Sequence, residues 1–180
     1  MMQHKCKVTV LDKKLFPELQ REYLADPKSG ACPFYNVGDE FIFERYGGKD
    51  DFWTMGKGSQ CAEAWDCISR YIYTALQGGS IMHGWTNDDR VMIACCQDGT
   101  RPVIFKIERL DYKAVYAEGV KTPEDAEALC ARFKKISGVT DAVWDGERGF
   151  AEVYMDVDIN DYVLSEAVRK AGAFKAVKIE

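Results

Sequence analysis

The chain has 180 residues, with 47% hydrophobic and 29% charged side chains. This length suits two small units of about 110 and 70 residues. The net charge is −5, from 14 basic and 15 acidic side chains in residues 1–110 and 10 and 14 in residues 111–180. The sequence has neither a basic stripe to neutralise phosphates nor an apolar run of ~18 residues, so we expect no nucleic-acid binding and no membrane insertion. The amino terminus lacks the apolar stretch of a signal peptide, which indicates a cytoplasmic protein.

The first part of the chain predicts a strand, a short helix and a second strand. Apolar and polar side chains alternate over residues 6–11 and 40–44, which favours strands. Between them, residues 15–24 predict an amphipathic helix. The glycine-rich, polar stretch 47–59 predicts a loop.

A longer helix is the clearest prediction in this half. Apolar side chains recur at helical spacing between residues 60 and 77, while Glu63, Asp66 and Arg70 lie opposite. Gly78-Gly79 ends the helix. The predicted buried face consists of Cys61, Ala64, Trp65, Ile68, Ile72, Ala75 and Leu76.

A hairpin follows the helix. Its strands are predicted over residues 90–96 and 101–108. Asp98-Gly99 between two apolar runs favours a two-residue turn, which places Cys96 opposite Arg101. Because neighbouring strand residues point to opposite faces, Cys96 should face the core and Cys95 the solvent. Residues 1–110 therefore predict a unit of mixed α+β structure.

Residues 111–180 predict a second unit with the element order β-α-β-β-α-β, a ferredoxin-like sandwich. The predicted strands cover residues 112–117, 139–144, 151–158 and 174–179. Thr122 is a good N-cap, followed by Pro123 at the first helical position and Asp125 at the third, and Asn160 is a candidate cap for the second helix. Alternation in the third strand predicts one buried face and one solvated face.

Three short motifs carry a family resemblance in this second unit. They are Glu118-Gly119-Val120, Ser137-Gly138-Val139, and the pattern Leu164, Ala167-Val168, Ala171-Gly172. Over about the last 70 residues the chain resembles the heavy-metal-associated domains of copper chaperones and metal pumps. In that family two cysteines at the start of the first helix bind Cu(I) or a similar soft ion. Thr122 and Asp125 stand at those positions here, so the resemblance implies the fold without its metal-binding cysteines.

The first unit carries motifs of its own. They are Cys32-Pro33-Phe34, Cys61 with Ala64-Trp65, Gly78-Gly79, and the run Cys95-Cys96-Gln97-Asp98-Gly99-Thr100-Arg101-Pro102-Val103. On these motifs, most of residues 5–110 resembles a small prokaryotic family of uncharacterised function, seen mainly in anaerobes. That family implies no activity for this chain.

The cysteines are the candidates for chemistry. There are seven, an odd number, and the sequence contains no Cys-x-x-Cys pair, which argues against a disulfide scaffold, a zinc ribbon or a thioredoxin motif. Four of them could bind zinc, copper or an iron–sulfur cluster, or act in redox chemistry. These candidates are Cys32, Cys61, Cys95 and Cys96. Packing as small apolar side chains is the explanation that the sequence favours for them.

No catalytic residue is predicted. His83, beside Trp85, has neither a nucleophile nor a carboxylate at motif spacing, so a loop histidine with a local hydrogen bond is expected. The sequence therefore predicts a non-catalytic cytoplasmic binding or regulatory protein. The alternative is a thiolate metal-binding or redox protein that uses the four candidate cysteines. The cofactor, the small-molecule, metal or protein partner and the oligomeric state stay open.

Overall fold

The structure is a computed structural model that describes residues 2–44 and 61–180. It has the mixed α+β architecture that the sequence predicts. The chain divides into two units, here called the N-terminal unit (His4–Arg109) and the C-terminal unit (Leu110–Glu180 with the first residues of the chain). The loop predicted over residues 47–59 lies outside the described residues.

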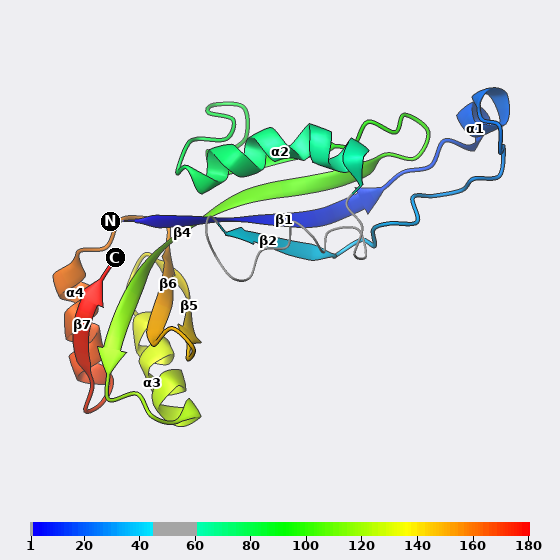
Figure 1. The fold of residues 1–180 in the computed structure, drawn as a ribbon. Coiled ribbons are helices and arrows are strands. Elements are labelled where there is room, and N and C mark those ends of the chain that lie inside the picture. The colour runs from blue at the N-terminus through cyan, green and yellow to red at the C-terminus, as the bar shows by residue number, and fades with distance from the viewer. Residues whose placement is uncertain (1, 45–60) are drawn as a thin grey trace. The chain divides into compact units, whose positions relative to one another are not determined.

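The N-terminal unit is a β-sheet with strand order β2-β1-β4-β3 and two helices (Figure 1). Its elements are β1 (Gln3–Lys13), α1 (Pro17–Tyr23), β2 (Glu40–Glu44), α2 (Ala62–Leu76), β3 (Val91–Cys95) and the first part of β4 (Val103–Glu118). Figure 1 shows α2 lying along one face of this sheet. The core of the unit therefore forms between α2 and the strands.

The apolar face of α2 supplies much of this core. Ala64, Ile68 and Ile72 are almost fully buried, as the helical spacing predicts, and they pack with Val8 and Phe105 from the sheet. Burial of one such aliphatic side chain stabilises a fold by about 1.5–3 kcal/mol. The helix is thus held by its apolar face and not by a side-chain cap, which its start lacks.

The register of the β3–β4 hairpin differs from the prediction. Cys95 pairs with Ile104, and the Cys96 N–H donates to the Val103 carbonyl at 3.0 Å. Cys96 was expected opposite Arg101, so the predicted register is wrong by two residues. A shift of two leaves every side chain on its predicted face. Cys96 is accordingly buried and Cys95 exposed, as predicted.

The side chain of Asp98 explains the wider connection. It accepts hydrogen bonds from the backbone N–H groups of Thr100 at 2.9 Å and Arg101 at 3.2 Å. Gly99 does not adopt the positive φ that a two-residue Asp-Gly turn of type I′ requires. The aspartate therefore closes a longer loop.

Strand β4 continues from one unit into the other. The sequence predicted two strands here, over residues 101–108 and 112–117, whereas the structure forms one strand from Val103 to Glu118. The intervening residues, Arg109, Leu110 and Asp111, contain neither glycine nor proline, so nothing in the local sequence breaks the strand.

The C-terminal unit has antiparallel strands in the order β7-β4-β6-β5, with two helices on one face (Figure 1). Its further elements are α3 (Pro123–Phe133), β5 (Val139–Asp145), β6 (Phe150–Met155), α4 (Asp161–Ala171) and β7 (Lys175–Ile179). Leu129 and Phe133 of α3 and Leu164 of α4 are fully buried against the sheet. This core is separate from that of the N-terminal unit.

Both predicted helix starts in this unit are confirmed. Thr122 and Asp125 form a capping box: the Thr122 hydroxyl accepts from the Asp125 N–H at 3.2 Å, and the Asp125 carboxylate accepts from the Thr122 N–H at 3.1 Å. Asn160 caps α4 by accepting from the Tyr162 N–H at 2.8 Å. Caps of this kind each stabilise a helix by about 1 kcal/mol.

The sequence predicts that one face of the third strand is solvated. In the structure, the face of β6 that points away from the helices is largely buried instead. Phe150 is 5% exposed and Glu152 is 7% exposed. Aromatic rings crowd this face, with Tyr116 and Phe150 centroids 4.9 Å apart, and the Tyr154 hydroxyl donates to Glu152 at 2.5 Å. Apolar and polar residues still point to opposite faces of β6, but both faces are covered by neighbouring side chains.

Among the described residues, no helix has both the length and the apolar character needed to cross a membrane.

Candidate functional site

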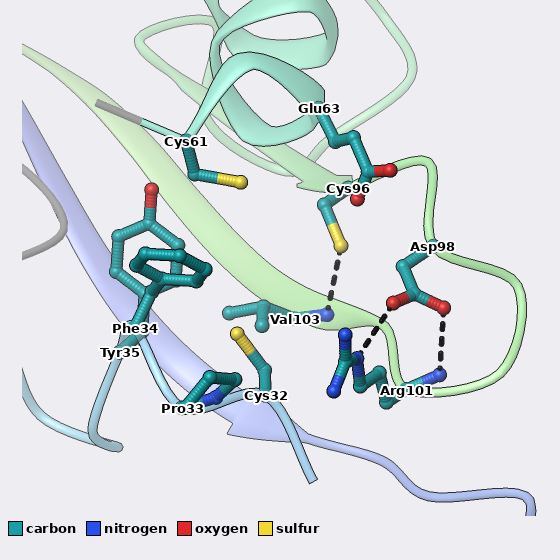
Figure 2. Close-up of a pocket in the computed structure, with 10 residues that line it drawn as sticks. All are labelled: Cys32, Pro33, Phe34, Tyr35, Cys61, Glu63, Cys96, Asp98, Arg101 and Val103. Carbon is teal, nitrogen blue, oxygen red and sulfur yellow. Dashed lines mark hydrogen bonds and ion pairs between the residues drawn. The ribbon is translucent and has the colours of Figure 1, made fainter. Parts of the chain in front are cut away.

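Three of the four candidate thiols line one pocket of the N-terminal unit. Figure 2 shows the sulfur atoms of Cys32, Cys61 and Cys96 directed towards the same space from three segments of the chain. Cys95 is not in this pocket; its side chain is exposed and its Sγ donates to the Cys96 carbonyl at 3.3 Å. Three of the four candidate cysteines could therefore act together at one site, and Cys95 could not.

Each thiol is positioned by a different element. Cys61 is the residue that immediately precedes α2, in an extended conformation. Cys96 follows β3, and Cys32 lies in the loop between α1 and β2 and is followed by Pro33. The Val103 N–H donates to Cys96 Sγ at 3.3 Å, which fixes that sulfur at the start of β4.

Burial favours the protonated form of Cys96 and Cys67. It raises the pKa of Cys96 above the ordinary value for a thiol, although hydrogen bonds from backbone N–H groups oppose the effect. Burial also raises the pKa of Cys67, in α2, to about 12. Cys67 does not line the pocket, and its Sγ donates to the Ala64 carbonyl at 3.0 Å. At neutral pH Cys96 is therefore a thiol that must lose its proton before it can bind a metal ion.

Tyr35 is a pocket residue that sequence reasoning missed. The side chain is 1% exposed, yet its hydroxyl has no hydrogen-bond partner among the residues that the structure describes. Figure 2 shows this hydroxyl on the Cys61 side of the pocket. Burial, followed by the nearby thiols, raises the pKa of Tyr35 well above its ordinary range, so the hydroxyl stays a donor. The only sequence signal was its place directly after Cys32-Pro33-Phe34.

The charged side chains at the pocket sum to one negative charge. Arg101 Nε donates to Asp98 Oδ2 at 2.8 Å, and this ion pair raises the pKa of the Arg101 guanidinium. Glu63 supplies a second carboxylate. The lining therefore suits a cation better than an anion.

The pocket is small, with a volume of about 40 Å³. Organic ligands occupy pockets of about 300–1,000 Å³, so this space suits one ion or one or two water molecules. Within residues 2–44 and 61–180, no group of three or more His, Cys, Asp or Glu side chains is arranged to hold a metal ion. The thiols thus line the space without forming a three-ligand site.

The two positions that the sequence resemblance would align with metal-binding cysteines do not fit a soft ion. Thr122 Oγ1 accepts the Asp125 N–H, and Asp125 Oδ2 accepts the N–H groups of Lys121 and Thr122. These oxygens are hard donors, and they already cap α3. The start of α3 is therefore a helix cap.

His83 has the local hydrogen bond that the sequence predicts. Its Nδ1 lies 2.7 Å from Asp89 Oδ2 on an exposed loop. Asp89 also accepts from the Gly84 N–H at 3.3 Å, so the carboxylate organises the loop.

Comparisons of the chain with protein-family models, curated proteins and solved structures find no match. The chemistry of the thiol pocket is therefore the basis for assigning a function.

Proposed function

We propose that this chain is a non-catalytic binding protein whose N-terminal unit takes up one soft metal ion of the Cu(I) type. The observation that carries the proposal is the pocket of Cys32, Cys61 and Cys96 around the unpartnered hydroxyl of Tyr35. Buried polar groups are rarely left without a partner, and an absent ion or water is one of the usual reasons.

The donor set favours a soft ion. Thiolates select Cu(I), zinc and iron–sulfur clusters, whereas hard ions prefer oxygen ligands. Two thiolates are sufficient for Cu(I), so the proposal does not require the three or four protein ligands of a tetrahedral zinc site. The negative charge left by Glu63 and Asp98 against Arg101 adds attraction for a cation.

Ion binding in this pocket is coupled to proton release. Burial raises the pKa of Cys96, so the thiol must lose its proton when the ion binds. The Tyr35 hydroxyl, which remains protonated, can then donate a hydrogen bond to a thiolate. Affinity should therefore fall as the pH is lowered.

Elemental analysis of protein purified anaerobically, followed by Cu(I) titration against a competing chromophoric chelator, tests the proposal. We expect one equivalent of ion, bound more weakly in at least two of the single variants Cys32→Ser, Cys61→Ser and Cys96→Ser and lost when all three are replaced together. Cys95→Ser is the matched control and should bind like the natural chain. Metal-free protein that fails to compete for Cu(I) would exclude the proposal. Loss of two titratable thiols on mild oxidation, without metal uptake, would favour a redox role instead.

The C-terminal unit is proposed to be a ferredoxin-like module that does not bind metal at the start of its first helix. The strand order β7-β4-β6-β5, with both helices on one face, supports this proposal. The cap made by Thr122 and Asp125 supports the loss of the metal site. This unit would then serve binding or regulation, and the free thiols of the chain are consistent with a cytoplasmic location.

A further inference from the structure

A second pocket lies in the C-terminal unit, in the groove between α3 and α4. Its volume is about 330 Å³, which falls in the range of pockets that hold small organic molecules. Besides Glu166, the residues that line it are Arg132, Ile136, Tyr162, Val163, Ala167 and Lys170. The groove and the thiol pocket belong to different units of the chain.

Arg132 lines this groove, and one nitrogen of its guanidinium lacks a hydrogen-bond partner. Its Nε is buried and has no hydrogen-bond partner among the described residues. The side chain also makes no ion pair within that part of the chain. A buried guanidinium nitrogen without an acceptor costs stability, and a charged group costs more than a neutral one. The missing partner is therefore an acceptor, and preferably an anion.

The other charges at the groove leave it positive. Lys170 contributes a second cation. Glu166 is the one acidic residue of the lining, and its Oε2 accepts from Arg169 Nη2 at 2.6 Å. Because that carboxylate is already paired, the charges of Arg132 and Lys170 are not compensated within the groove.

The rest of the lining is apolar. Ile136 and Ala167 form part of the wall, and Val163 and the ring of Tyr162 are exposed beside them. An occupant must therefore combine an anionic head with an apolar body. The planar guanidinium of Arg132 matches a carboxylate in particular, since it can donate two parallel hydrogen bonds.

We propose that the groove between α3 and α4 is a binding site for a small organic carboxylate with an aromatic or aliphatic body. The carboxylate binds Arg132 with support from Lys170, and the body packs between the two helices. This site does not depend on the thiol pocket, so either proposal can fail without the other.

Binding of 2-naphthoate to the ¹⁵N-labelled full chain, followed by NMR, tests this site. We expect saturable shifts of the amides of α3 and α4, with a Kd of about 1 mM or lower for a ligand of this size. The neutral analogue 2-naphthamide should bind at least about tenfold more weakly, because it lacks the charge. Equal binding of the amide, or no shifts in these helices, would overturn the proposal.

Two variants separate a binding role of Arg132 from a structural one. Arg132→Met keeps the approximate length of the side chain and removes the charge. This variant should bind 2-naphthoate at least about tenfold more weakly than the natural chain. Lys135→Met removes one charge from an exposed position just beyond α3 and should bind like the natural chain. The ligand-free Arg132→Met variant should unfold at the same temperature or higher, because the unsatisfied donor is gone. Unchanged affinity, or a thermal midpoint several degrees lower, would contradict the assignment.

Discussion

Two side-chain atoms in the described part of the chain are buried without a partner, and each belongs to a residue that lines a pocket. Tyr35, with its Oη, lines the thiol pocket, and Arg132, with its Nε, lines the groove between α3 and α4. Native proteins satisfy nearly all such groups. At the scale of single residues, these two atoms are therefore the strongest indications of where ligands bind.

Replacement of Tyr35 by Phe should separate stability from binding. The change removes an unsatisfied buried hydroxyl, so the free energy of unfolding without ligand should stay the same or rise by about 1 kcal/mol. Cu(I) affinity should fall, by about two- to tenfold, because the thiolate loses a donor. Chemical denaturation and chelator competition measure the two effects. A large loss of stability would show that the hydroxyl has a partner in the folded protein.

Cys95 and Cys96 should differ in reactivity although they are neighbours. Cys95 is exposed, whereas Cys96 is buried with a raised pKa, so an alkylating reagent should modify Cys95 at least about tenfold faster. Timed alkylation with peptide mapping gives both rates in one sample. Cys6, which is fully buried and has a pKa raised by burial to about 12, serves as the protected reference. Equal rates for the two neighbours would contradict the hairpin register.

At the scale of the elements, caps and loop closures contribute local stability that single substitutions can test. The start of α3 is held by the capping box of Thr122 and Asp125, and Asp88 organises the turn before β3. In both cases a side chain satisfies backbone N–H groups that the fold leaves open.

Thr122→Ala should destabilise the C-terminal unit by about 1 kcal/mol, since the Asp125 N–H loses its acceptor. Thr122→Ser keeps the hydroxyl and should recover most of that stability. Denaturation in metal-free buffer compares the three proteins. If Ser were as destabilising as Ala, the methyl group rather than the cap would be responsible.

Asp88 should make a pH-dependent contribution. The Arg90 side chain, which donates to the carboxylate at 2.8 and 3.0 Å, lowers the pKa of Asp88 to about 2. Because the unfolded carboxyl titrates near 3.8, the contribution is complete above about pH 4 and is lost as the pH falls towards 2. The pair is partly solvated, so we expect about 1 kcal/mol rather than the full value of the pKa shift.

Urea denaturation of the natural chain and Asp88→Asn from pH 7 downwards measures this contribution. The difference in unfolding free energy should be largest near neutral pH and should shrink below pH 4. A difference that stays constant down to pH 3 would mean that the amide disturbs the turn by some other route.

At the scale of the whole molecule, two separate apolar cores stabilise the chain. Ile68 lies in the core of the N-terminal unit and Leu164 in that of the C-terminal unit, and both are fully buried. The strand β4 is shared by the two units. A cavity created in one core should therefore weaken mainly the unit that contains this core.

Ile68→Ala and Leu164→Ala should each cost about 2–5 kcal/mol. Hydrogen exchange should accelerate in α2 for the first variant and in α3 and α4 for the second, since each cavity weakens the core around it. Exchange that accelerates equally in both units for either variant would show that the chain opens as a single cooperative unit.

The sequence by itself determined the local features of this protein. The strand at residues 40–44, the apolar face of α2, the caps at Thr122 and Asn160, and the opposite faces of Cys95 and Cys96 all follow from periodicity and side-chain chemistry. These properties depend on residues a few positions apart, so pattern is enough to predict them.

Only the tertiary structure decided which distant residues meet. In the folded protein Cys32, Cys61 and Cys96 line one pocket, and Cys95 lies outside it. The hairpin register differs from the predicted one by two residues, because the Asp98 side chain closes a longer loop. The tertiary structure also left the Tyr35 hydroxyl and the Arg132 Nε buried without hydrogen-bond partners among the described residues. Burial and hydrogen bonding depend on how helices and strands pack, and that packing is a long-range property which no local pattern encodes.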